Sequence, residues 1–249
     1  MEALGMILSN AVLDDVVFWK EPEKKSINHE TYNKKPVRES GSGIVAIDKI
    51  YCINLESSVD RKKHMKAEFK KHCLPAIFIS AIHPKTKEFR KVQNKVDLGF
   101  DRRCFCINSC SHKKRKLRPT EIAISLSHYH IYRKIVRNHD NWALVCEDDI
   151  TFIDNFSQIV SRHIPLDIWE DNQPHIIMCG GSNDNWGLKK NDLEIFQLRH
   201  LHNGCYSNYC YIINFYAAQM LLKYFFPIKR PEDSFKRHII HKNKIHCHK

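Results

Sequence analysis

Three consecutive acidic residues, Glu147, Asp148 and Asp149, directly follow the apolar run 142–146. Adjacent like charges at the end of a buried strand repel one another and raise one another's pKa, so they need a positive partner. Carboxylate oxygens suit Mg²⁺ or Mn²⁺, which keep part of their water and share phosphate oxygens of a substrate. A metal site is therefore one interpretation. The other is a polar turn whose acids cap the next helix near Asp154 or pair with the abundant Lys and Arg.

Two further clusters contain side chains that bind metals. Four soft or borderline ligands lie close together in a basic stretch: Cys104, Cys106, Cys110 and His112. They could hold zinc, although their spacing differs from the paired C-x2-C pattern, which favours reduced thiols without a metal. The C-terminal tail could also chelate a metal, but we expect it to be solvated and disordered: His238, His241, His246, Cys247 and His248.

Strands and helices alternate before the acidic residues. Residues 49–55 and 77–81 are β-branched and aromatic runs typical of strands. Between them, residues 60–72 place Met65 and Phe69 four apart among basic residues, which predicts an amphipathic helix. Strand, helix and strand in this order indicate an α/β unit.

A long helix and a buried strand lead to the acidic residues. Pro119 is placed for a helix start, and one face of that helix can be apolar: Ile122, Leu126, Tyr129, Tyr132, Ile135 and Val136. Because 142–146 is wholly apolar, we expect a central strand covered on both faces. Further strands are expected at 175–179, 194–199 and 206–213, followed by a helix at 215–226.

The predicted organisation is one α/β domain over residues 47–235. It follows a polar N-terminal extension, 1–46, and precedes a tail rich in His and Lys, 236–249. The basic stretch 84–118 shows neither the helical nor the strand period, so we predict an inserted loop there.

The composition restricts the class of protein. Of 249 residues, 43% are hydrophobic, which excludes a disordered or fibrous chain. The apolar stretch 217–226 is interrupted by Gln219 and Lys223 and is shorter than the ~20 residues of a membrane span. No secretory signal is recognised, and the cysteines are interpreted as reduced, so we expect a cytoplasmic protein without stable membrane insertion. The formal charge of +12 indicates an anionic partner: nucleic acid, a membrane surface or a nucleotide diphosphate.

Several short motifs occur in a fixed order between residues 49 and 233. They are Ile53-Asn54-Leu55 with Asp60-Arg61, then Ala81, then Pro119-Thr120-Glu121 with Ser127-His128, and finally Glu147-Asp148-Asp149. In this order the sequence resembles glycosyltransferase family 25, which includes lipooligosaccharide galactosyltransferases and collagen hydroxylysine galactosyltransferases. The resemblance implies a GT-A-like fold, a single nucleotide-binding domain with a mixed, mostly parallel sheet flanked by helices. It also implies inverting, metal-dependent transfer of a hexose, galactose or glucose, from a UDP-sugar to a saccharide or a hydroxylysine-containing protein.

The resemblance also assigns roles to residues. Donor binding falls to Asn54, Leu55, Arg61, Ala81, Ser127, His128 and Asp148. Glu147 and Asp149 have the outer positions of a DxD-like motif and would hold Mn²⁺ or Mg²⁺, with Asp149 as the first choice for a direct ligand. Outside the family context, His128 is equally consistent with a hydrogen-bonded packing residue.

An inverting displacement needs a base that takes the proton of the acceptor hydroxyl. Asp184 follows a predicted strand in a glycine-containing loop, and Asp233 matches a late acidic position of the family. The sequence does not choose between them, and either could be a solvated loop acid.

Two alternative functions stay open. The basic insert is not part of the family pattern, and the sequence ends 16 residues after Asp233 whereas family members generally continue. A catalytically silent relative that binds nucleotide sugars is therefore one alternative. The other is a nucleic-acid-binding protein, suggested by the run Lys113-Lys114-Arg115-Lys116. Such runs are usually solvated, and no helix-turn-helix, RNP or zinc-finger signature accompanies this one, so we do not expect nucleic acid as the partner.

Overall fold

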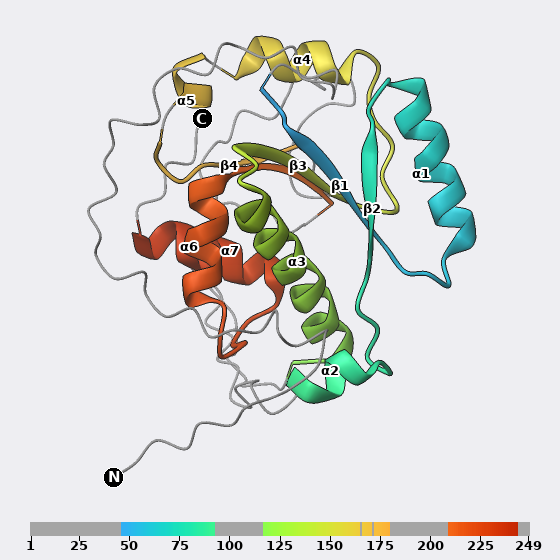
Figure 1. Cartoon of the computed structure of the whole chain (residues 1–249), viewed down its shortest axis with the longest axis vertical. Coiled ribbons are helices and arrows are strands. Elements are labelled where there is room, and N and C mark those ends of the chain that lie inside the picture. The colour runs from blue at the N-terminus through green and yellow to red at the C-terminus, as the bar shows by residue number, and fades with distance from the viewer. Residues whose placement is uncertain (1–45, 93–116, 165, 171, 180–208, 244–249) are drawn as a thin grey trace, which may run out of the picture. The chain divides into compact units, whose positions relative to one another are not determined.

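The computed structural model of the chain describes residues 46–92, 117–164, 166–170, 172–179 and 209–243 (Figure 1). Their centre is a five-stranded sheet in the order β2-β1-β3-β5-β4. The strands are β1 (Lys49–Asn54), β2 (Ala76–Ser80), β3 (Trp142–Glu147), β4 (Ile176–Met178) and β5 (Cys210–Asn214). The predicted α/β class and the predicted strands within these ranges are confirmed.

The described sheet is mixed, with one strand that runs against the others. β1 runs parallel to both β2 and β3, whereas β5 is antiparallel to β3 and to β4. β4 therefore runs in the same direction as β1, β2 and β3, and β5 alone among the described strands is reversed. The expectation of a mixed, mostly parallel sheet is confirmed for the described residues.

Both faces of the sheet are covered, because side chains alternate along each strand. Tyr51 and Val145 belong to the core shared with α3 (Pro119–Asn138) and α6 (Phe215–Tyr224). Cys52 and Cys146 belong to the opposite core, shared with α1 (Val59–Lys71) and α4 (Phe156–His163). The strand predicted over 142–146 is thus central and buried on both faces, as its apolar run indicated.

Helix α3 crosses the sheet and packs against α6 and α7 (Glu232–Asn243) (Figure 1). Its start is fixed by the Arg118 backbone N–H, which donates to Glu121 Oε2 at 2.8 Å. Met65 and Phe69 of α1 are buried, which confirms the four-residue spacing as the inner face of an amphipathic helix.

A buried hydrogen bond lies toward the end of β1 and β3 that is opposite the acidic residues. The Tyr51 hydroxyl donates to Asp140 Oδ2 at 2.5 Å and accepts from Asn138 Nδ2 at 3.2 Å. Burial and the neighbouring Asp140 raise the pKa of Tyr51 above its ordinary value. This contact ties β1 to the end of α3.

Three described helices differ from the prediction or were not predicted, namely α2 (Lys87–Val92), α5 (Leu166–Glu170) and α7. Inside the stretch predicted as an inserted loop, α2 forms and buries Phe89. The tail expected to be disordered begins as α7, because Phe235 and Ile239, four residues apart, pack into the core. Helix α5 was not predicted, whereas α4 begins at Phe156, close to Asp154, where the next helix was expected.

The remaining predictions lie outside the described residues. They concern the extension up to residue 45, the strand over 194–199, Asp184 and the possible zinc ligands Cys104, Cys106, Cys110 and His112. Among the helices that are described, none has the length and apolar character required to cross a membrane.

Candidate functional site

The acidic triplet, as we call Glu147, Asp148 and Asp149, lies where β3 ends. Because β1 and β3 are parallel and Ile53 is the register partner of Glu147, Asn54 ends β1 at the same edge of the sheet. The loop after β1 then leads into α1, whose first turn carries Arg61. Ligands of open α/β sheets bind at this kind of strand end.

Asp148 is buried and faces the side of the sheet that α1 covers. Asn54 Nδ2 donates to Asp148 Oδ2 at 2.7 Å, and Arg61 Nη1 donates to Asp148 Oδ1 at 3.0 Å. The same Arg61 nitrogen lies 3.1 Å from Asp149 Oδ2. These contacts raise the pKa of Arg61, the hydrogen bond to Asp148 most of all. The sequence-based alternative of pairing with a basic residue is therefore confirmed for these two acids.

Asp149 is the most accessible of the triplet, with 38% of its side chain exposed, against 25% for Glu147 and 10% for Asp148. Partial burial and the nearby Glu147 raise its pKa, and Arg61 opposes that rise. The like charge of Glu147 destabilises the ionised form of Asp149. A cation placed beside Asp149 would therefore stabilise that form.

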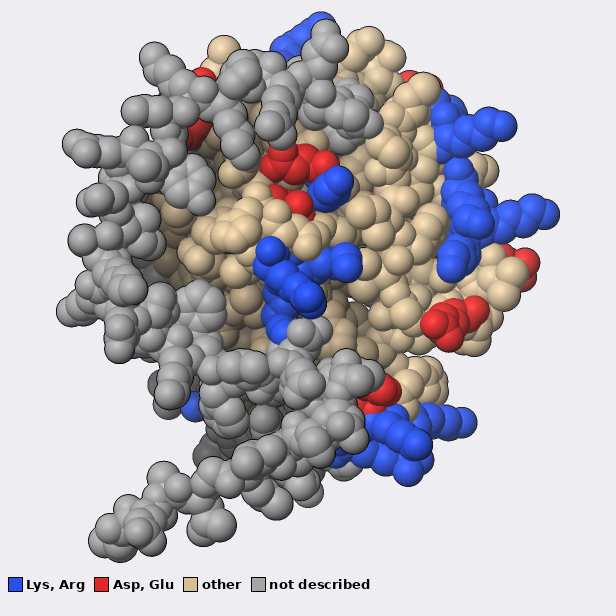
Figure 2. Space-filling model, viewed as in Figure 1, with Lys and Arg blue, Asp and Glu red and all other residues tan. Residues whose placement is uncertain are grey.

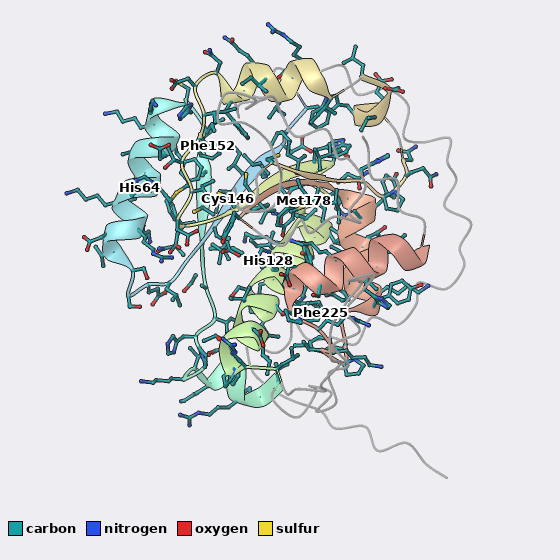
Figure 3. All side chains as sticks on the ribbon, turned by 180° about the vertical axis from the view of Figure 1, so that it is seen from behind. His64, His128, Cys146, Phe152, Met178 and Phe225 are labelled. Atoms are coloured by element: carbon teal, nitrogen blue, oxygen red, sulfur yellow. The ribbon has the colours of Figure 1, made fainter. Side chains whose placement is uncertain are left out.

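Glu147 faces the other side of the sheet, toward α3. Its Oε1 lies 3.5 Å from His128 Nε2, and His128 is completely buried on α3 (Figure 3). Burial by itself would raise the pKa of Glu147, but the contact with His128, together with the charges of Lys236 and Arg61, outweighs it and lowers that pKa. His128 is thus both a packed residue and a direct neighbour of the triplet.

The other residues predicted to bind the nucleotide-sugar donor lie near the end of β1. Ser127 Oγ accepts from the Ile82 backbone N–H at 2.9 Å and donates to the Ala123 carbonyl at 2.8 Å, so it ties the segment after β2 to α3. Ala81 donates its N–H to the Asn54 carbonyl at 2.9 Å. Leu55 is half-buried directly after β1. Their contact with a nucleotide sugar stays a prediction.

Of the two candidate bases, Asp233 is described and Asp184 is not. Asp233 is half-buried in the first turn of α7, and its Oδ1 accepts from the Ser234 backbone N–H at 2.6 Å.

Four side chains that bury polar groups behind His128 were not predicted from the sequence as part of the site. Tyr132 was predicted only as an apolar helix position, and Glu232 stands beside the acid that was singled out. Tyr211 and Lys236 complete the group, and all four are buried. An acid next to Asp233 and a lysine one turn later were the available signals.

The acidic triplet fits a divalent cation only in part. The described ranges contain no preformed group of three or more His, Cys, Asp and Glu side chains arranged around one metal position. Asp149 and Glu147 are the carboxylates that could contribute. Mg²⁺ and Mn²⁺ commonly take one or two carboxylates and complete their shell with water and substrate phosphate.

The sequence is similar to that of one known protein family over most of its length. Residues 47–236 match the model of glycosyltransferase family 25, described as "LPS biosynthesis protein". A Haemophilus influenzae protein named "Putative glycosyltransferase" is 30% identical over 110 residues, which are 44% of this chain and 35% of that protein. The chain thus spans about a third of the length of this curated relative.

Proposed function

The chain belongs to glycosyltransferase family 25, and we propose that it transfers a hexose, galactose or glucose, from a UDP-sugar to a hydroxyl group with inversion at the sugar. The acceptor is a saccharide or a hydroxylysine-containing protein, and the fold is of the GT-A type. The observation that carries this proposal is the acidic triplet at the joint end of β1 and β3, with Arg61 across two of its acids.

The chemistry of the transfer requires positive charge at this place. When the bond between sugar and diphosphate breaks, negative charge develops on the leaving diphosphate, and cations next to it stabilise the transition state. Asp149 and Glu147 would hold Mn²⁺ or Mg²⁺, which supplies Lewis-acid stabilisation of the diphosphate. Arg61 is 56% exposed in its side chain and stands at the rim of the site, so it is placed to bind a phosphate as well.

The acceptor side needs a base. Asp233 is our candidate within the described part of the chain, because it opens α7 next to the buried Glu232 and shares that helix with Lys236. Asp184 is the second candidate. For the true base, replacement of the carboxylate by an amide removes the proton acceptor without changing the donor site.

The experiment that tests the donor site compares two substitutions of equal charge and size. We measure binding of UDP by calorimetry with and without Mn²⁺ in the wild type, in Asp149→Asn and in Asp154→Asn. Asp154 is a suitable control because it lies five positions further on, is exposed, and pairs with Lys71 at 3.0 Å. We expect Mn²⁺-dependent binding in the wild type and in Asp154→Asn, and its loss in Asp149→Asn.

The same experiment separates the alternatives. Equal UDP affinity in all three proteins would exclude Asp149 as a metal ligand, and no binding of UDP to the wild type would exclude the donor site itself. Binding without turnover on any acceptor would indicate a catalytically silent relative.

Nucleic acid is the remaining alternative, and the basic surface bears on it. Figure 2 shows Lys and Arg side chains gathered along α1, and this helix exposes Lys63, Lys66 and Lys70. One face of an amphipathic helix is expected to be charged in this way, so the surface is explained without a partner. Binding of the protein to DNA or RNA at physiological salt, in the absence of UDP binding, would favour this alternative.

A further inference from the structure

Two side chains of α1 hold the segment that follows the acidic triplet. His64 Nε2 lies 2.9 Å from the Ile150 carbonyl oxygen and donates to it, because a carbonyl can only accept a hydrogen bond. Glu68 Oε2 accepts the Phe152 backbone N–H at 3.0 Å. Figure 3 labels His64 on this helix and Phe152 on the segment beside it. We call His64 and Glu68 the α1 clasp.

The clasp continues a stripe of α1 that begins at Arg61, whose guanidinium contacts the triplet. Arg61, His64 and Glu68 follow one another at intervals of three and four, so they share one face of the helix. The helix rises by about 6 Å from His64 to Glu68. Two residues of an extended chain span about 6.6 Å, so the two contacts of the clasp fit the chain from 150 to 152 together.

Phe152 anchors this segment in the core on the α1 side of the sheet. Its side chain is 4% exposed and packs against Phe69 and Phe156, with ring centres 5.6 and 4.8 Å apart. Glu68, with 13% of its side chain exposed, supplies the acceptor for the backbone N–H of this buried residue. Loss of such an acceptor is costly, so the path of the segment depends on Glu68.

The contact beyond the clasp is weaker. Lys71 Nζ lies 3.0 Å from Asp154 Oδ1, but 57% and 83% of the two side chains are exposed. Ion pairs between exposed side chains contribute little to stability, because water and salt screen the charges. The clasp therefore ends at Glu68, and Asp154 remains suitable as a control for donor binding.

We propose that His64 and Glu68 are positioning residues for Asp149. Asp148, directly before it, is held by hydrogen bonds from β1 and α1, and the chain directly after it is held by the clasp. Asp149 itself has 38% of its side chain exposed. With the backbone held on both sides, the fold sets the direction of this carboxylate before a ligand arrives. The inference rests on the proposed function only in what Asp149 binds.

Hydrogen exchange at the Phe152 amide tests the clasp without any ligand. Glu68→Met removes the acceptor and keeps an unbranched side chain that suits a helix, whereas Glu68→Gln removes the charge and keeps an acceptor oxygen. We expect this amide to exchange about 10-fold faster in Glu68→Met, the factor that corresponds to one lost hydrogen bond. Glu68→Gln should exchange at the rate of the wild type. An unchanged rate in Glu68→Met would overturn the proposal.

Donor binding measures the positioning itself. Residues that orient a metal ligand typically change metal affinity by roughly 10-fold or more when replaced, so Glu68→Met should weaken Mn²⁺-dependent UDP binding by about that factor. Glu68→Gln should bind as the wild type does, and so should Lys66→Met, a substitution of an exposed lysine on the same helix. An equal loss in Glu68→Gln and Glu68→Met would assign the effect to charge and refute the role of the hydrogen bond.

His64 is tested in the same assay. His64→Ala removes the donor to the Ile150 carbonyl, so UDP binding should weaken, whereas His64→Gln keeps an N–H donor and should restore it. Equal weakening in both variants would exclude His64 as a positioning residue.

A control in the same core separates loss of positioning from loss of stability. Val160 is 1% exposed and belongs to the same core as Phe152, but it lies on α4, outside the clasp. Val160→Ala should lower the free energy of unfolding in urea and leave UDP affinity unchanged. If Val160→Ala weakened UDP binding as much as Glu68→Met, the effect would be one of stability and the proposal would be wrong.

The proposed function and the clasp can fail separately. If the wild type and Glu68→Met bind UDP equally well with Mn²⁺, the inference fails and the function stands. If the wild type binds no UDP, the function fails, and binding of Mn²⁺ alone is followed by the electron paramagnetic resonance signal of the free ion. Weaker Mn²⁺ binding in Glu68→Met would then support the positioning of Asp149. Equal binding, or no Mn²⁺ binding to the wild type, would overturn it.

Discussion

Replacement of Lys236 by methionine should change how the stability of the protein depends on pH. In the folded protein burial lowers the pKa of Lys236 from 10.5 to about 8. Between these values an unfolded chain keeps the proton that the folded chain has released, so the stability of the wild type rises with pH through this group. Below about pH 8 the full cost of burying the ammonium is present; it is relieved as the pH approaches 10.5.

The size of this effect on the free energy of unfolding follows from the two pKa values of Lys236, 10.5 in the unfolded chain and about 8 in the folded protein, which differ by about 2.5. At 1.36 kcal/mol for each pKa unit, the full effect is about 3 kcal/mol. Between pH 8 and 10, about 2 kcal/mol of it should be recovered. Loss of Lys236 also removes the charge that opposes the raised pKa of Glu232, so the variant should lose stability as Glu232 ionises. Both effects raise the free energy of unfolding of the wild type relative to that of Lys236→Met as the pH rises.

The assay is urea unfolding of the wild type and Lys236→Met at several pH values between 8 and 10. Other groups with raised pKa values, such as Tyr51 and Cys146, titrate in both proteins, and their contributions cancel in the difference between the two free energies of unfolding. Lys66→Met, a substitution of an exposed lysine, is the control for net charge and should differ from the wild type by a constant amount. If the free energy of unfolding of Lys236→Met also differed from that of the wild type by the same amount at every pH, burial would not lower the pKa of Lys236, and the reasoning would be refuted.

Two further substitutions test other parts of the structure. Tyr51→Phe removes the hydrogen bond that the buried carboxylate of Asp140 accepts at 2.5 Å, so the free energy of unfolding, measured with urea, should fall by about 1–3 kcal/mol; a change below about 0.5 kcal/mol would show that the contact contributes little. Asp233→Asn and Asp184→Asn should each leave UDP affinity unchanged, and the one that removes the base should abolish turnover of the UDP-sugar in a transfer assay. Full turnover in both variants would exclude both acids as the base.

Local patterns were sufficient to predict β1, β2 and β3 and the acidic end of β3. The run 142–146 is apolar throughout, and a strand buried on both faces needs such a run, so its central place followed from composition alone. The spacing of Met65 and Phe69 likewise determines which face of α1 is buried. The triplet could be placed at a strand end because the strand before it was recognisable.

The contacts behind the triplet could not be predicted in the same way. Tyr132 and Glu232 are 100 positions apart, and Tyr132 and Tyr211 are 79 positions apart, so only the packing of α3, β5 and α7 brings them together. Helix α7 was missed because its two buried apolar residues stand among His and Lys, whose composition suggests a solvated tail. The role of Ser127 in holding the segment after β2 also depends on a contact across 45 positions.

The alternation of side chains at the end of β3 has a thermodynamic consequence. Glu147 lies on the face that α3 covers and contacts His128, whereas Asp148 lies on the face that α1 covers and contacts Arg61. A ligand held by the triplet therefore acts on both layers at once. Because binding to the folded state alone adds to its stability, the free energy gained there is shared between two helices on opposite sides of the sheet. Occupancy of one strand end can thus make the two cores of this protein unfold as one cooperative unit.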